Sequence, residues 1–260
     1  MYQDLDRPPL QPRVLNRWLP EPWREVRVLE SIGSTNDYVA ALARAGEREG
    51  LVVVAEHQFL GRGRLDRTWT SPPRAGLTFS LLLRPAVAAG ARSWLPMLLA
   101  ACAAEAVAAR TDLDAALKWP NDLLVGGRKV GGVLAEATGD AVVVGFGLNV
   151  STRRDELPRD DASSLALETG GVVDRGPLLL ALLRAMGPAY AAWLADPATA
   201  RERYRARCDT IGRAVRVLLP GDEALEGEAT DVDEAGRLVV AHDGTTTAVS
   251  AGDVVHVRPA

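Results

Sequence analysis

The sequence predicts an α+β fold, in which a domain of interspersed strands and helices is followed by a small β-barrel. Between residues 24 and 210, short β-branched segments alternate with longer segments rich in Ala and Leu, a pattern typical of strands and helices in one domain. From Ile211 onward, five short strand-like segments separated by Pro-Gly, Ala-Gly and Asp-Gly pairs occupy fewer than 50 residues. Such closely spaced strands predict a small barrel, so we place a domain boundary near residue 210.

The expected elements of the first domain follow in order along the chain. Residues 1–24 contain five prolines and predict an irregular N-terminal arm. Ser34-Thr35-Asn36-Asp37 predicts a helix start ahead of residues 38–43, with Gly46 as its stop. The expected strands are 24–30, 51–56, 76–84, 115–119, 122–125, 129–137 and 141–150; further helices are expected at 93–110, 178–194 and 198–207, and loops at 58–70 and 151–171, the second with one helical turn.

Three segments therefore divide the chain. They are an arm at 1–24, a first domain at 25–209 and the barrel at 210–260. Within the barrel, the strands are expected at 215–219, 226–232, 237–241, 246–250 and 254–257.

Composition excludes several classes of protein. The 260 residues are 47% hydrophobic and 25% charged, which predicts a folded core. The net charge of -4 argues against a protein that mainly neutralises nucleic acid. The opening MYQDLDRPPL lacks the features of a signal peptide, and no apolar run approaches the roughly 20 residues of a membrane span. Cys102 and Cys208 form no C-x-x-C pair, so we expect a cytoplasmic protein with no protein-bound metal.

The basic residues are distributed unevenly between two types. Of the 30, 28 are Arg, and the two lysines, Lys118 and Lys129, lie close together in the sequence. We treat this bias as a pointer to the region that contains them.

The segment from Gly61 to Trp69 carries the strongest local signal. Its glycines allow tight turns and close approach of a ligand, while Arg62 and Arg64 supply planar cations suited to carboxylate and phosphate oxygens. Trp69 offers a face on which a base could stack. These residues predict a loop that binds an anionic nucleotide-like molecule; the alternative is a solvated Arg-rich loop with Trp69 anchored in the core.

A second signal is Lys118-Trp119-Pro120-Asn121-Asp122, followed by the segment 129–136. The turn expected at Gly126-Gly127 folds one segment onto the other. Lys129 could then neutralise a carboxylate or phosphate, and Asp122 could accept a proton or orient an amine. The alternative is a pair of surface lysines on an ordinary hairpin.

Two shorter motifs have both a structural and a functional interpretation. Ser34-Thr35-Asn36 is a helix N-cap that could also bind a polar ligand. The segment 145–149, Gly-Phe-Gly-Leu-Asn, ends a strand with small residues that allow close approach. Simple strand packing is the alternative for the second motif.

Taken in order, these motifs resemble those of the biotin–protein ligases, also called biotin–acetyl-CoA-carboxylase ligases. The resemblance runs from about residue 27 to residue 257. It implies a mixed sheet flanked by helices, related to class II aminoacyl-tRNA synthetases, followed by an SH3-like barrel. It also implies a two-step reaction, in which biotin and ATP, with magnesium, form biotinyl-5′-AMP, and the biotinyl group then passes to one lysine of a biotin carboxyl carrier domain.

The resemblance also assigns roles to individual residues. It implies that Lys129, Arg64 and Asp122 are catalytic, with Asn121 and Asp122 near the reacting centre. Biotin is expected to contact Ser34, Thr35, Asn36, Gln58, Arg62, Gly63, Arg64 and Lys129, and ATP is expected to contact Arg62, Arg64, Trp69, Asn121 and Asn149.

Some expectations and alternatives remain at this point. About 24 residues precede the first strand, fewer than the DNA-binding domain of some family members, so we expect no DNA operator binding. We expect no membrane association, and a monomer or a homodimer.

Two other functions are alternatives to a biotin–protein ligase. One is a lipoate–protein ligase, and the other is a non-catalytic nucleic-acid-binding protein using Arg62, Arg64, Arg67 and Trp69.

Overall fold

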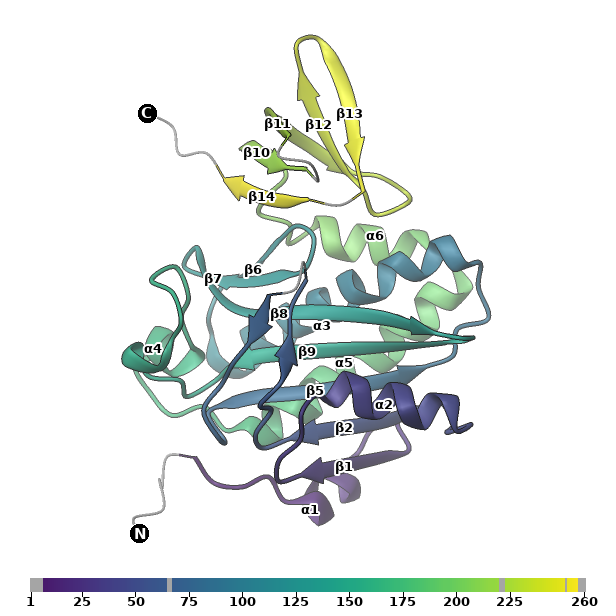
Figure 1. The fold of residues 1–260 in the computed structure, drawn as a ribbon, viewed down its shortest axis with the longest axis vertical. Coiled ribbons are helices and arrows are strands. Elements are labelled where there is room, and N and C mark those ends of the chain that lie inside the picture. Colours follow the sequence, from purple (N-terminus) through teal and green to yellow (C-terminus); the bar gives the residue numbers. More distant parts are fainter. Residues whose placement is uncertain (1–6, 65–66, 220–222, 251, 257–260) are drawn as a thin grey trace.

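A seven-stranded mixed sheet forms the centre of the first domain (Figure 1). The computed structural model describes residues 7–64, 67–219, 223–250 and 252–256. The strand order is β1 (Glu25–Leu29), β2 (Leu51–Ala55), β5 (Gly76–Leu83), β9 (Ala141–Asn149), β8 (Arg128–Thr138), β7 (Asp122–Val125) and β6 (Ala115–Lys118). Strands β1 and β2 pair in parallel, and the remaining neighbours are antiparallel. The mixed sheet is therefore confirmed.

Helices cover both faces of this sheet (Figure 1). Helix α2 (Thr35–Arg44) lies on one face, where Val39 packs with Leu82 and Val143. Helices α3 (Trp94–Thr111) and α5 (Arg175–Ala195) lie on the other, in the core that contains Leu81 and Val144. Side chains of successive strand residues point to opposite faces, which is why neighbouring residues of β5 and β9 belong to different cores.

Helix α5 is the one helix in the described part of the chain that is long and apolar enough to cross a membrane. More than half of its apolar window is buried, against α3, α6 (Ala198–Arg205) and β5. It therefore packs as a core helix of this domain.

The residues before β1 are not irregular throughout, which corrects the sequence-based prediction. A short helix, α1 (Pro12–Arg17), begins with a proline in its first turn, where the missing N–H costs nothing. The Asn16 side chain then exchanges two hydrogen bonds of 2.8 Å with the backbone of Val26 in β1. These bonds fix the helix at the edge of the sheet.

The segment predicted as a loop at 58–70 contains a short hairpin, which is a second correction. Strands β3 (Gly61–Arg62) and β4 (Thr68–Trp69) pair with each other. The turn predicted within 151–171 corresponds to α4 (Leu165–Thr169), preceded by the 3-10 helix η2 (Arg154–Glu156). Another 3-10 helix, η1 (Ala89–Ser93), leads into α3.

The second domain is a five-stranded antiparallel sheet. Its order is β13 (Thr245–Val249), β12 (Leu238–His242), β11 (Ala224–Val232), β10 (Ala214–Leu218) and β14 (Asp253–His256). Its buried side chains include Val215, Val217, Ala229, Val232, Leu238, Val240, Val249 and Val254. All five predicted strands are present, although Val257, predicted in the last strand, lies outside the described residues.

The second domain contacts the β6 end of the central sheet (Figure 1). The segment that follows α6 crosses beside β6, where the Leu117 N–H donates to the Arg207 carbonyl and the Asp209 N–H donates to the Leu117 carbonyl, both at 2.8 Å. The domain boundary expected near residue 210 therefore falls at a hydrogen-bonded junction.

Candidate functional site

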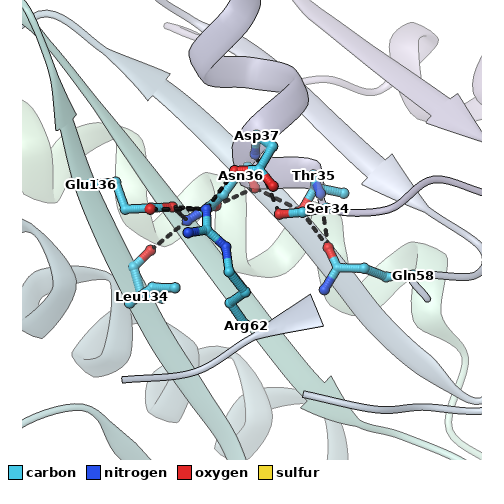
Figure 2. Close-up of polar contacts among 9 residues, drawn as sticks. Ser34, Thr35, Asn36, Asp37, Gln58, Arg62, Leu134 and Glu136 are labelled. Atoms are coloured by element: carbon cyan, nitrogen blue, oxygen red, sulfur yellow. Dashed lines mark hydrogen bonds and ion pairs between the residues drawn. The ribbon is translucent and has the colours of Figure 1, made fainter. Parts of the chain in front are cut away.

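The first turn of α2 is buried against the sheet and forms one wall of the site (Figure 2). Ser34 caps the helix, with its Oγ accepting from the Asp37 N–H at 3.3 Å. Ser34, Thr35 and Asn36 are all buried. The predicted N-cap is confirmed, and it places short polar side chains deep in the fold.

A hydrogen-bond network joins this turn to two other elements. The Thr35 N–H and hydroxyl both donate to Oε1 of Gln58, at 2.8 and 3.2 Å (Figure 2). The hydroxyl of Ser80, fully buried in β5, lies 2.8 Å from Thr35 Oγ1. The structure thus brings Thr35 and Gln58 together as predicted. Ser80 was missed, although a hydroxyl within the apolar strand 77–83 is a signal that could have identified it.

Asn36 is engaged entirely within the protein. Its Nδ2 donates to the Leu134 carbonyl at 3.2 Å and to Oε2 of Glu136 at 2.7 Å (Figure 2). Its Oδ1 accepts from the Ser80 hydroxyl at 2.6 Å. A Cβ atom at Gly145 would lie less than 3.0 Å from that Oδ1. Asn36 therefore fastens α2 to β8, and glycine at 145 leaves the space it needs.

A cavity of about 400 Å³ opens beside this network. It is lined by Arg62, Gly63, Arg64, Arg67, Thr68, Leu134 and Glu136. Arg62 crosses its edge, donating to Asp37 and, at 3.0 Å, to Oε1 of Glu136 (Figure 2). A cavity of this size suits a small organic molecule, and its cations suit an anionic one.

The β6–β7 turn and the start of β8 supply a second polar group. Arg64 Nη1 lies 3.4 Å from Asn121 Oδ1, and Asn121 Nδ2 donates to the Val133 carbonyl at 2.9 Å. Lys129 Nζ lies 2.6 Å from Asp122 Oδ1. The structure therefore joins Arg64 to Asn121 and Lys129 to Asp122. The second pair lies across the hairpin predicted at Gly126-Gly127.

Trp69 and Asn149 lie at the ends of β4 and β9. A Cβ atom at Gly147 would meet the Trp69 indole at less than 3.0 Å, so the indole lies directly on β9. Its Nε1 is buried with no hydrogen-bond partner among the described residues. Asn149 is buried and donates from Nδ2 to the Ser163 carbonyl at 3.0 Å. The two glycines of the 145–149 motif are therefore explained by Asn36 and Trp69.

The described residues contain no cluster of three or more His, Cys, Asp or Glu side chains able to hold a metal ion. Cys102 and Cys208 are unpaired and buried. Burial raises the pKa of the Cys102 thiol to about 12. Neither cysteine is therefore poised for metal binding or nucleophilic chemistry.

Comparison with known proteins gives consistent matches along the chain. The profile of the biotin/lipoate A/B protein ligase family matches residues 28–150, and that of the biotin protein ligase C-terminal domain matches residues 210–257. The chain is 40% identical over 265 aligned positions to a biotin–acetyl-CoA-carboxylase ligase of Mycobacterium tuberculosis, covering 98% of this chain and 99% of that protein. It is 32% identical over 237 positions to the bifunctional ligase/repressor BirA of Escherichia coli, covering 88% and 73%.

Solved structures give the same result at the level of the fold. The biotin protein ligase of Aquifex aeolicus in complex with biotin and ATP superposes with a TM-score of 0.77 at 28% identity, covering 90% of this chain and 99% of that one. The biotin protein ligase of Leishmania major in complex with biotinyl-5-AMP gives 0.62 at 26% identity, covering 89% and 100%.

Proposed function

The chain belongs to the biotin protein ligase family, and on that premise we propose that it attaches biotin to protein in two steps that consume ATP. In the first step, a carboxylate oxygen of biotin attacks the α-phosphorus of ATP and pyrophosphate leaves. In the second, the amine of an acceptor lysine attacks the acyl carbon of biotinyl-5′-AMP, AMP leaves, and an amide bond forms.

The observation that carries this proposal is the presence of cationic side chains in one cavity and at the turn beside it. Arg62 and Arg64 line the cavity. Arg64 meets Asn121, and Lys129 pairs with the next residue, Asp122. Two anions, a carboxylate and a polyphosphate, must approach each other in the first step. Fixed cations suppress their repulsion and stabilise the charge that develops on the phosphorus.

We assign the biotin head group to the network on α2. Thr35 and Gln58 offer hydroxyl and amide groups whose orientation is fixed by Ser80 and by each other. Arg62 is half-exposed and already bridges two carboxylates, those of Asp37 and Glu136. The biotin carboxylate would compete with these acids for the same guanidinium, as expected for a cation that guides a carboxylate into place.

We assign the adenosine part of ATP to the region of Trp69 and Asn149. Asn149 Nδ2 donates one of its two hydrogens to the Ser163 carbonyl, which fixes the amide plane. Its Oδ1 can then accept a hydrogen bond from a ligand. The indole of Trp69 is part-buried, and its own Nε1 has no hydrogen-bond partner among the described residues. Magnesium is proposed to enter as a co-substrate bound to the ATP phosphates, since the described residues provide no ligand cluster for it.

The acceptor is proposed to be a biotin carboxyl carrier domain. The relative from Mycobacterium tuberculosis, which aligns with this chain over nearly its full length, is named for acetyl-CoA carboxylase. We place the reaction in the cytoplasm, where unpaired cysteines such as Cys102 and Cys208 persist.

Isotope exchange tests the proposed function directly. The purified protein is incubated with ATP, magnesium, labelled pyrophosphate and either biotin or lipoate. We expect label to enter ATP with biotin and not with lipoate. Exchange that depends on lipoate would overturn the choice of substrate, and the absence of exchange with either acid would overturn the enzymatic assignment in favour of a binding protein.

A further inference from the structure

The turn between β11 and β12 in the second domain docks onto two tryptophans of the first domain. Trp119 Nε1 donates to the Gly236 carbonyl at 3.0 Å, and Trp94 Nε1 donates to the Glu234 carbonyl at 2.7 Å. Both tryptophans are almost completely buried. Gly236 has a φ of +78°, a conformation that glycine adopts without strain. One four-residue turn, 233–236, therefore receives both indoles.

The backbone of Trp119 is also bonded, to the side chain of Thr210. The Trp119 N–H donates to Oγ1 of Thr210 at 3.0 Å, and Thr210 is fully buried. The same Oγ1 lies 3.0 Å from Nε2 of His256 in β14. Trp119 is thus fixed at its side chain and at its backbone by groups from residue 210 onward.

Trp119 stands immediately before the part of the site that carries Asn121 and Asp122. Asn121 meets Arg64, and Asp122 meets Lys129. Beneath the turn, the fully buried hydroxyl of Tyr204 lies 3.5 Å from the Pro120 carbonyl. Asn121 and Asp122 follow Trp119 by two and three residues. The position of Trp119 therefore bears on the Arg64–Asn121 and the Lys129–Asp122 contacts.

We propose that Trp119 and Thr210 are positioning residues for adenylate formation, through which the docked C-terminal sheet sets the geometry of Asn121 and Asp122. The inference rests on the proposed function and deepens it, because it gives the second domain a part in the ATP half of the reaction. The network of Thr35, Gln58 and Ser80 shares no hydrogen bond with this turn among the described residues. Biotin recognition should therefore be independent of it.

Two matched substitutions test the role of Trp119. Trp119→Phe and Trp94→Phe each retain an aromatic ring and remove one indole N–H that donates to the same turn. The two variants should therefore lower the thermal unfolding midpoint by similar amounts. We expect Trp119→Phe to reduce kcat/KM for ATP in the exchange assay about tenfold, because a small displacement of reacting groups is costly. Calorimetric biotin affinity should stay at the wild-type value. Trp94→Phe should leave both quantities unchanged.

Thr210 allows a rescue experiment. Thr210→Val is close in shape but leaves the Trp119 N–H without an acceptor, so it should raise KM for ATP, whereas Thr210→Ser keeps the hydroxyl and should restore it. Equal ATP kinetics in the two Phe variants, or a parallel loss of biotin affinity in Trp119→Phe, would overturn the inference alone. Absence of biotin-dependent exchange in the wild type would instead overturn the proposed function on which it rests.

Discussion

Nζ of Lys129 lies 2.6 Å from Oδ1 of Asp122, across the hairpin formed by β7 and β8. The two residues do not pair directly in the register, since Asp122 is opposite Gly132 and Lys129 is opposite Leu124. A Cβ atom at Gly132 would already touch both side chains at 3.5 and 3.6 Å. These are ordinary van der Waals distances, so Gly132 lies directly beside the pair. The carboxylate of Asp122 holds the Lys129 ammonium at the edge of the site.

We expect Lys129→Ala to slow adenylate formation far more than it weakens biotin binding. The ammonium acts between two anions at the moment of attack, a contact commonly worth about 3–4 kcal/mol, or about two to three decades in rate. Lys129→Arg should rescue little, because the broad guanidinium does not fit where a compact ammonium does. Single-turnover formation of biotinyl-5′-AMP is compared with calorimetric biotin affinity in folded variants. Full activity in Lys129→Arg would contradict the shape argument, and an unchanged rate in Lys129→Ala would contradict the assignment.

Arg64→Gly should release the adenylate before transfer. Arg64 lines the cavity and meets Asn121, and a guanidinium can bridge phosphate oxygens. The variant should therefore biotinylate an added lysine-rich bystander protein, detected by blotting. Arg74→Gly is the control, since Arg74 pairs with Glu30 outside the cavity and has a φ of +62° that glycine accepts. Equal retention of the intermediate in Arg64→Gly and wild type would show that Arg64 is not a clamp.

The two glycines of β9 should respond differently to an added methyl group. Gly145→Ala places a methyl on the Asn36 amide and should weaken biotin binding. Gly147→Ala places one on the Trp69 indole and should raise KM for ATP. Overpacking of this kind costs about 1–3 kcal/mol. Gly90→Ala is the control, because a Cβ there meets nothing within 4 Å. The prediction fails if both β9 variants impair the same ligand to the same degree.

His256 should make folding stability depend on pH. Burial, and then the charges of Lys118 and Arg213, lower its pKa to about 4 against the opposing effect of Asp209. An unfolded histidine takes up a proton near pH 6.5, so the folded state resists a proton that the unfolded state accepts. The free energy of unfolding should therefore fall as pH drops from about 6.5 to about 4, with no contribution from this group above that range.

His256→Gln tests this dependence by denaturant unfolding at pH 7.5 and pH 5. Gln retains an acceptor for the Thr210 hydroxyl and does not titrate, so its loss of stability between the two pH values should be smaller than that of wild type. The hydrogen bond from Arg7 lowers the pKa of Glu156, and carboxylates of this kind contribute equally to both proteins, so their effect cancels in the comparison. Identical losses in both proteins would remove His256 as the cause.

Much of the fold followed from local patterns because local physics determines it. The strand at Leu51–Ala55 is buried along its whole length and appears in the sequence as an unbroken apolar run. Gly126 and Gly127 both have positive φ, which is what a tight hairpin turn demands. By contrast, α1 was hidden by the prolines around it, and its position depends on Asn16 reaching β1.

The sequence motifs name the residues that we propose to bind the ligands, but not the residues that support them. Arg64 and Lys129, which we propose to contact the ligands, belong to recognisable motifs. Asn36 and Ser80, in contrast, are 44 positions apart in the sequence and are joined by a hydrogen bond. The turn 233–236 docks through backbone carbonyls. Every residue has a carbonyl, so the sequence does not indicate which ones accept these hydrogen bonds. Long-range contacts of this kind become visible only once the chain is folded.

The scarcity of lysine has a consequence for how this enzyme coexists with its own intermediate. Biotinyl-5′-AMP is a mixed anhydride, which acylates exposed primary amines. In this sequence, two side chains, both lysines, carry a primary amine. Nζ of Lys129 is engaged by Asp122 at 2.6 Å, which hinders its attack on an acyl group. The remaining side-chain amine is that of Lys118, which lies on β6 opposite Asp122. The protein thus offers its reactive product little to attack, and side-chain self-biotinylation should be confined to that single position.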